Sequence, residues 1–328
     1  MKLQLLIPQY RETDAVIRPL LDSVAIQQNV DFREIGAVIV NDGRDVHLDW
    51  RALQARYPFE VQYHLAPHGG VSAARNRALD AATADYVMFC DADDMFCHAC
   101  GLWVVMREIE QGFDALASCF TEETRRGGAP AYINRDNDST FVHGKAYRRA
   151  FLRNNGIRWN DALTVHEDSY FNVLAQSLAG KVRYIHTPFY LWRWRDDSVC
   201  RHDPDYVLKT YGKLIDSADA LAGEFTRRGD AAKAAIQVAV TVFDAYYAMN
   251  KPLWINQDNG AYRDATELCF AEFFAKWRGA WEGMDRADKM QISEDIRARN
   301  VKAGMQMERI TIKDWLNKIE TIWTGQHS

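Results

Sequence analysis

The segment YVMFCDADDMF, residues 86–96, runs from five apolar residues directly into three carboxylates. The run from Tyr86 to Cys90 has the composition of a buried β-strand, and Asp91, Asp93 and Asp94 follow it with no turn residue between. Ionised carboxylates this close repel one another, and burying one is costly unless it is paired or bound to a metal. The segment therefore predicts a core strand whose end carries a charged site.

The first half of the chain alternates short apolar runs with amphipathic stretches. We expect strands and helices in turn, with strands at 3–8, 35–43, 59–65 and 85–94 and helices at 13–27 and 71–83. Strands that read as near-continuous apolar runs and are joined by helices indicate an α/β, Rossmann-like fold, with a mostly parallel sheet flanked by helices. Ligands bind such sheets at the carboxyl ends of the strands, where Glu12, Asp42 and the three aspartates would gather.

From residue 205 onward the pattern is helical. Apolar residues recur at helical spacing in four stretches, 205–225, 230–249, 261–277 and 311–323. We therefore expect a catalytic α/β domain over residues 1–204 and an α-helical domain over residues 205–328. The helical domain is expected to pack on the catalytic domain, to contact an acceptor or to form a homo-oligomer, and the sequence leaves these roles open.

The composition is that of an ordinary globular protein, with 48% hydrophobic and 26% charged residues among 328. The formal net charge of −5 gives no electrostatic case for binding nucleic acid or an anionic membrane. No apolar run approaches a membrane span, and the six cysteines do not resemble a disulfide framework. We expect a cytoplasmic protein, in which the CHAC segment at 97–100 contributes buried thiols.

The DADD segment is a candidate metal site. If the backbone stays extended there, Asp91 and Asp93 lie on one face of the strand and Asp94 faces away. Two converging carboxylates suit a hard divalent cation such as Mg²⁺ or Mn²⁺, which prefers oxygen ligands. The alternative is a polar turn that solvates the end of the strand.

Two glycines, Gly69 and Gly70, stand just before the predicted helix 71–83. Backbone amides and the helix dipole at such a position favour an anion, and Arg75 adds a charged fork. The segment lacks the Lys-Ser/Thr pair of a P-loop and the full glycine pattern of a dinucleotide site. An ordinary loop-to-helix turn is the alternative.

Two further clusters lie beyond residue 160. Glu167 and Asp168 open a predicted helix, where acids either offset the helix dipole or supply a general base. Further on, Arg193 and Arg195 alternate with tryptophans, which indicates a phosphate site or simple stacking of cation on ring. His143 and His186 are interpreted as local hydrogen-bonding groups, and residues 121–138 as a flexible loop ahead of the GKAYRR segment.

The ordered series of motifs resembles the family 2 glycosyltransferases of GT-A fold. The series is LIPQY, VIVNDGRD, HGGVSAARNRAL, MFCDADD, GKAYRRAFL, HEDSYF and YLWRWRDDSV, and it covers roughly residues 1–200. Each motif alone is common, and the order of the set carries the resemblance. Two departures concern the nucleotide: Arg11 stands where the family usually has Asn, and Asn41 stands at a position that is usually acidic.

The resemblance implies a role for each matching residue. Asp168 matches the catalytic base, with Glu167 and His166 beside it toward the acceptor. Asp91 and Asp93 match the metal motif, with Asp93 as the direct ligand. The remaining matches concern the donor: the nucleotide loop of Pro8, Tyr10 and Glu12, the base-contacting Asp42, and then Gly70, Arg75, Asp91, Asp94, Arg193 and Arg195.

The function implied is inverting, metal-dependent transfer of a sugar from a nucleotide-sugar, most often a UDP-sugar, to an acceptor hydroxyl. The acceptor is a glycan, a lipid-linked sugar, a protein or a modified nucleic-acid base, so nucleic acid enters only as an acceptor. A nucleotidyltransferase would share the sheet and the metal acids, but would leave Glu167 and Asp168 without a role. A non-catalytic module that binds a nucleotide or glycan is the second alternative.

Overall fold

The structure is a computed structural model that describes residues 1–43, 46–136, 140–196, 198, 201 and 203–327. Contacts within the chain divide it into two compact units, Met1–Ser198 and Val199–Ser328. The division lies close to the boundary that the change from alternating to helical periodicity indicates, between residues 204 and 205.

The first unit is built on a mixed β-sheet with the strand order β3-β2-β1-β4-β8-β6-β9-β5, and β7 pairs with β6 outside this path. The strands are β1 (Leu3–Gln9), β2 (Ile35–Asn41), β3 (Glu60–Leu65), β4 (Tyr86–Phe89), β5 (Met95–Phe96), β6 (Ala115–Arg126), β7 (Ala129–Arg135), β8 (Lys145–Arg148) and β9 (Val182–Trp192). The predicted strands in the first half form the parallel part, β3-β2-β1-β4, and β8 is antiparallel to both of its neighbours. The α/β class expected from the sequence is confirmed.

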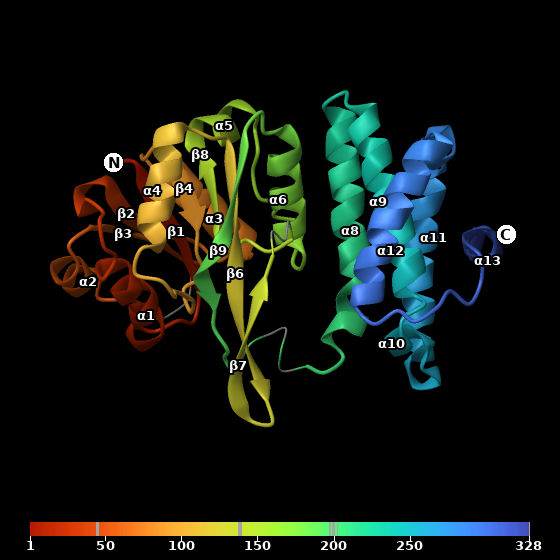
Figure 1. Ribbon diagram of the computed structural model, residues 1–328, viewed down its shortest axis with the longest axis horizontal. Helices are drawn as coiled ribbons and strands as arrows, with labels where there is room; N and C mark the ends of the chain where they lie inside the picture. The colour runs from red at the N-terminus through yellow and green to blue at the C-terminus, as the bar shows by residue number, and fades with distance from the viewer. Residues whose placement is uncertain (44–45, 137–139, 197, 199–200, 202, 328) are drawn as a thin grey trace. The chain divides into compact units, whose positions relative to one another are not determined.

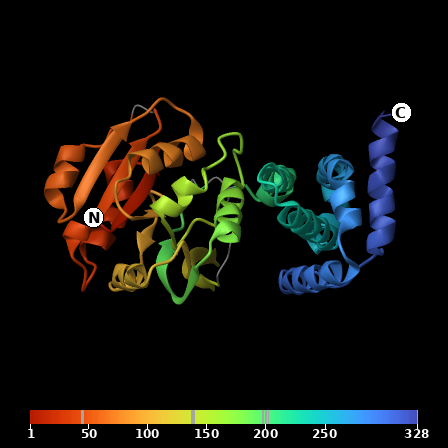
Figure 2. The same ribbon diagram turned by 90° about the horizontal axis from the view of Figure 1, so that it is seen from above.

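Helices flank this sheet (Figures 1 and 2). They are α1 (Asp14–Ala25), α2 (Trp50–Arg56), α3 (Gly70–Ala81), α4 (Gly101–Gln111), α5 (Arg149–Asn154) and α6 (Glu167–Leu178), with a short 3-10 turn η1 (Phe32–Glu34). Every residue of β1 is buried. Its alternate residues Leu3, Leu5 and Ile7 share a core with α1 and α4, and α3 lies against β1 and β2. Coverage of both faces explains why this strand is mostly apolar, with the buried polar exceptions Gln4 and Gln9.

Residues 121–138 were expected to form a flexible loop, and that prediction is wrong for the part that the structure describes. Strands β6 and β7 pair antiparallel from Phe120 and Arg135 to Arg126 and Ala129. The turn between them is Gly127-Gly128, with φ of 58° and 83°. Positive φ at both central residues is the requirement of a tight two-residue hairpin, which glycine meets at low cost. Residues 137 and 138 lie outside the described part of the chain.

The second unit is helical, as expected. It contains α8 (Tyr206–Arg227), α9 (Ala231–Ala248), α10 (Pro252–Ile255), η2 (Gln257–Asn259), α11 (Gly260–Gly283), α12 (Arg286–Lys302) and α13 (Ile312–His327). Its core includes Val238, Phe270, Trp254 and Trp315, all almost fully buried. Helix α12 was not predicted, because its weakly apolar sequence buries only Ile296 and Asn300. Among the described residues no helix has both the length and the apolar character needed to cross a membrane.

Candidate active site

The DADD segment forms a turn, so the extended backbone assumed from the sequence is not found. The backbone N–H of Asp94 donates to the carbonyl of Asp91 at 3.2 Å, directly after β4 ends. The turn brings Asp94 near His143, whose Nδ1 lies 3.4 Å from its carboxylate. The three aspartates consequently have different partners. The alternation of side chains along an extended strand could not predict this.

Arg75 joins Asp91 to the acids at the start of α6. Its guanidinium donates to Asp91 at 2.9 Å, to Glu167 at 3.0 Å and to Asp168 at 2.7 Å. Its side chain is only 3% exposed and stacks on Trp159, with 4.4 Å from Cζ to the ring centroid. Burial opposes the charge, but the three carboxylates outweigh burial and hold the pKa of Arg75 above its usual range. This contact set identifies Arg75 as a positioning residue within the site.

Asp168 lies in the first turn of α6, where its second oxygen accepts a hydrogen bond from the backbone N–H of Val142 at 3.0 Å. Burial raises its pKa, Arg75 opposes the increase, and Glu167 and Asp91 add to it, so the pKa of Asp168 rises to about 7. A carboxylate with this pKa exchanges protons near neutral pH, as a general base requires. The residue before α6, His166, has left-handed backbone angles of φ 61° and ψ 20°. Such strain in a non-glycine residue is common at functional sites.

The acids of the turn carry excess negative charge. Burial alone would raise the pKa of Asp91, but Arg75 and His143 outweigh it and the pKa is lowered. Burial raises the pKa of Asp93, with Asp91 and Glu12 contributing and Arg195 opposing. Burial and the two neighbouring aspartates also raise the pKa of Asp94. A bound cation would relieve this repulsion.

The residues around the turn fit a divalent cation. One group of potential ligands, Asp91, Asp94 and His143, has ligand atoms within 4.8 Å of one another. Asp93 was predicted from the sequence instead of Asp94, and its side chain is 33% exposed, compared with 1% for Asp94. Carboxylate oxygens suit Mg²⁺ and Mn²⁺, and a half-open position such as that of Asp93 leaves room for oxygens of a substrate.

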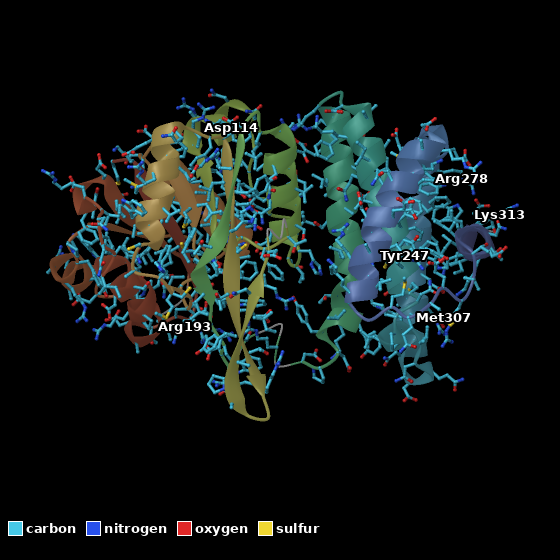
Figure 3. The ribbon with its side chains drawn as sticks, in the orientation of Figure 1. Asp114, Arg193, Tyr247, Arg278, Met307 and Lys313 are labelled. Atoms are coloured by element: carbon cyan, nitrogen blue, oxygen red, sulfur yellow. The ribbon has the colours of Figure 1, made fainter. Side chains whose placement is uncertain are left out.

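Arg193 and Arg195 follow β9, and both contact the DADD turn. The backbone N–H of Arg193 donates to Asp94 at 3.0 Å, and its guanidinium donates to the carbonyl of Asp93 at 3.0 Å. The guanidinium of Arg195 lies 3.2 Å from the Asp93 carboxylate and 3.8 Å from that of Glu12. Arg193 lies toward the lower end of the sheet in Figure 3. The structure therefore brings both arginines to the acids that the sequence analysis selected.

The loop after β1 gathers the remaining nucleotide candidates. Pro8 is buried within β1, and the carboxylate of Glu12 accepts the backbone N–H of Tyr10 at 2.7 Å. The ring of Tyr10 stacks on His68, with 5.1 Å between centroids and 24° between planes. The imidazole is 56% exposed. Two stacked rings at an exposed edge can receive a planar ligand ring, and His68 was not selected from the sequence.

Asp42 has a different environment from the one expected. Its two carboxylate oxygens accept the backbone N–H groups of Gly69 and Gly70 at 2.8 and 2.9 Å, and His68 Nδ1 lies 2.8 Å away. The anion expected at the start of α3 is therefore the side chain of Asp42 itself. Gly70 does not offer this amide to a ligand, and Asp42 acts by fixing the loop that carries His68.

Replacing Asp42 with Ala is expected to lower the free energy of unfolding by about 2 kcal/mol, because two amide–carboxylate hydrogen bonds are lost at a buried residue. Asp49→Ala is the matched control, since Asp49 is exposed and caps α2 by accepting from Ala52 at 3.1 Å. That control is expected to cost about 1 kcal/mol. Urea denaturation measures both, and equal losses would contradict the role assigned to Asp42.

Tyr190 was missed by the sequence analysis. Its hydroxyl donates to Asp94 at 2.9 Å and accepts the backbone N–H of Asp91 at 3.1 Å, so it bridges the two ends of the turn. The residue lies in β9 among apolar neighbours and is fully buried. Nothing in that local pattern distinguishes Tyr190 from an ordinary core aromatic.

Comparison with known proteins points to the same family that the sequence motifs resemble. Residues 5–161 match the model of glycosyl transferase family 2. The chain is 24% identical over 242 residues to EpsH of Bacillus subtilis strain 168, a provisionally assigned glycosyltransferase, and the match covers 66% of each protein. It is 24% identical over 226 residues to the glycosyltransferase GlyA of Streptococcus pneumoniae, covering 61% of this chain and 32% of GlyA. The chain thus spans less than two thirds of these relatives.

The fold also has solved counterparts. The crystal structure of S. aureus TarS 1-349 superposes with a TM-score of 0.64 at 17% identity, covering 95% of this chain and 94% of that one. Crystal structures of TarS 1-349 in complex with UDP and with UDP-GlcNAc also match. At this identity the likeness concerns the fold. The family model matches residues 5–161, within the first unit, so this part of the chain is similar to glycosyl transferase family 2, and the likeness to TarS shows that the chain has the GT-A fold.

Proposed function

We propose that the chain is an inverting, metal-dependent glycosyltransferase of the hexosyltransferase type. In this proposal residues 1–204 bind a nucleotide-sugar and catalyse transfer to an acceptor hydroxyl. The observation that carries the proposal is Asp168, a carboxylate with a pKa of about 7 that Arg75 links to the DADD turn. The match of residues 5–161 to the family 2 model supports the reaction class.

In the proposed reaction Asp168 removes the proton of the acceptor hydroxyl, whose oxygen attacks the anomeric carbon of the donor. The bond from that carbon to the diphosphate breaks on the opposite face, so one displacement inverts the configuration. Arg75 keeps the base oriented, since it donates to Asp168 and remains charged. Arg193 and Arg195 are proposed to face the diphosphate. A Mg²⁺ or Mn²⁺ ion held by Asp93 and Asp91 would supply Lewis-acid stabilisation of the leaving group.

A UDP-sugar is the proposed donor. The stacked rings of Tyr10 and His68 offer a platform for a nucleobase, and the similar fold of TarS has been solved with UDP and UDP-GlcNAc. Arg11 lies in the loop of Tyr10, and Asn41 is the last residue of β2, where it donates to the hydroxyl of Tyr63 at 2.9 Å. These residues are proposed to tune the choice of base.

The rate of transfer is expected to fall as the pH decreases through about 7, because protonated Asp168 cannot accept the hydroxyl proton. Arg75 opposes this protonation, and Glu167 and Asp91 favour it. A profile of kcat between pH 5 and pH 9, in the range that titrates this group, measures the effect. A flat profile across pH 7 would contradict the assignment of the base.

The first test is a panel of nucleotide-sugars with Mn²⁺, with Mg²⁺ or with EDTA, read by thermal shift and by release of nucleoside diphosphate. The proposal expects release that depends on the cation and is lost in Asp93→Ala. Release of pyrophosphate would favour a nucleotidyltransferase, and binding without turnover would favour a non-catalytic module. Residues 205–328 are proposed to contribute contacts to the acceptor or to a homo-oligomer. Measurement of the protein's size in solution tests the homo-oligomer.

A reducing compartment such as the cytoplasm is proposed as the location. The cysteines that the structure describes, Cys90, Cys97, Cys100, Cys119 and Cys269, are all free thiols. Burial raises the pKa of Cys90, which lowers its reactivity. The buried thiols expected at 97–100 are not found, because Cys97 is exposed and Cys100 is half-buried. Free thiols of this kind are typical of reducing compartments.

A further inference from the structure

The β6–β7 hairpin continues from the C-terminal end of β6, a strand that lies between β8 and β9 in the sheet. Strand β8 is antiparallel to both β4 and β6, so β6 runs in the same direction as β4. The end of β6 therefore lies on the same side of the sheet as the DADD turn. The hairpin extends below the sheet in Figure 1, and in Figure 3 Arg193 lies toward that end while Asp114, just before β6, lies at the opposite end.

The register of the hairpin sorts its side chains onto two faces. Glu123 pairs with Tyr132 and Arg125 pairs with Pro130. Directly opposed residues project to the same face of a sheet, and residues two apart along a strand share a face. One face therefore carries Glu123, Arg125, Pro130 and Tyr132. Tyr132 is 62% exposed, a large value for an aromatic ring.

Trp194 joins this face from the segment after β9. Its backbone N–H donates to the carboxylate of Glu123 at 3.1 Å, and the guanidinium of Arg125 lies 5.9 Å from its ring centroid. Its neighbour Arg195 lies 3.2 Å from the carboxylate of Asp93. We call Glu123, Arg125, Tyr132 and Trp194 the aromatic hairpin face, and its contacts lead directly to the DADD turn.

The opposite face of the hairpin has a different composition. It carries Glu122, Arg126 and Arg135, and Arg135 forms an ion pair with Glu122 at 2.5 Å. Ion pairs of this kind are ordinary on a solvated surface. The exposed ring of Tyr132 and the half-buried ring of Trp194 thus lie on one face with the carboxylate of Glu123 and the guanidinium of Arg125. Exposed aromatic and arginine side chains placed together are typical of binding surfaces.

We propose that the aromatic hairpin face binds a carbohydrate chain that contains the acceptor hydroxyl, an inference that rests on the proposed function. The apolar C–H face of a sugar ring packs on an aromatic ring, and its hydroxyls bond to carboxylate and guanidinium groups. Glu123 and Arg125 lie 4.0 Å apart and balance each other's charge, so the face offers no net positive charge to a polyanion. The occupant is therefore a neutral oligosaccharide, in preference to a nucleic acid.

The test compares Tyr132→Ala with Tyr184→Ala. Tyr184 is a matched control: it is 54% exposed and lies near the start of β9, paired with Ala117, at the other end of the sheet. The probes are a printed glycan array and, in solution, chitotetraose, cellotetraose and mannotetraose. We expect Tyr132→Ala to weaken binding of at least one glycan by about tenfold or more, and Tyr184→Ala and Tyr132→Phe to leave it unchanged.

The thermal shift with UDP and the hydrolysis of donor by water separate this inference from the proposed function. Both are expected to be unchanged in Tyr132→Ala. Equal glycan binding by Tyr132→Ala and the wild type would overturn the inference and leave the proposed function standing. The same holds if the wild type binds UDP but no glycan. If the wild type neither binds nor hydrolyses any nucleotide-sugar, the proposed function fails and the inference fails with it.

Discussion

Replacing Asp168 with Asn is expected to slow sugar transfer by about a thousandfold, within the range that a positioned general base contributes. The amide keeps the shape of the side chain and can still contact the backbone N–H of Val142, but it cannot accept the proton of the acceptor hydroxyl. Donor binding is expected to change little, because the groups proposed to hold the nucleotide, such as Tyr10 and Arg195, lie elsewhere in the site. Initial rates of diphosphate release with saturating donor measure the effect.

The matched control for this variant is Asp80→Asn. Asp80 is 61% exposed and pairs with Arg158 on the surface of the first unit. It is expected to retain the rate and the thermal stability of the wild type, since exposed ion pairs contribute little. If Asp168→Asn keeps a rate near that of the wild type while Asp80→Asn behaves as expected, Asp168 is not the base.

Replacing Arg75 with Ala is expected to lower the free energy of unfolding by about 3–5 kcal/mol and to abolish transfer. The substitution leaves three partly buried carboxylates without their shared cation, and an uncompensated buried charge is strongly destabilising. Removing the guanidinium also removes the group that opposes protonation of Asp168, so its pKa rises further above 7. Arg75→Lys restores a charge but not the three hydrogen bonds, and is expected to recover part of the stability.

Arg158→Ala is the control for the stability measurement. Arg158 donates to both oxygens of Asp80, at 2.6 and 2.8 Å, but the pair is exposed. Its loss is expected to cost less than about 1 kcal/mol. For activity, the acid limb of the pH profile should move to higher pH in Arg75→Lys if Arg75 acts through Asp168. A loss of stability no larger than that of Arg158→Ala would contradict the positioning role.

Much of the fold could be predicted because burial imposes a simple pattern. Strands β1, β2 and β4 are covered on both faces, so most of their residues are apolar, and the ends of β2 and β4 are marked by the aspartates that follow them. Helix α8 shows its buried face at helical spacing. The Gly127-Gly128 turn was missed, although two glycines between runs of β-formers are a recognised hairpin signal.

The geometry of the site could be predicted only in part. Arg75, Asp91 and Asp168 were predicted as site residues in three separate motifs. That they form one buried cluster depends on how α3, β4 and α6 pack. The DADD backbone follows a turn closed by a hydrogen bond between Asp94 and Asp91, and strand alternation cannot foresee it. Asp42 is likewise paired with local amides, because a loop folds back onto its carboxylate.

The central claim is tested most directly by following one reaction by phosphorus and proton NMR. Wild-type protein is mixed with Mn²⁺, UDP-GlcNAc or the nucleotide-sugar that gives the largest thermal shift, and the glycan bound on the array. The account predicts the nucleoside diphosphate of the donor as the phosphorus product, which is UDP for UDP-GlcNAc, and a new glycosidic bond of anomeric configuration opposite to that of the donor. Pyrophosphate as the product, or a bond that retains the configuration of the donor, would contradict it.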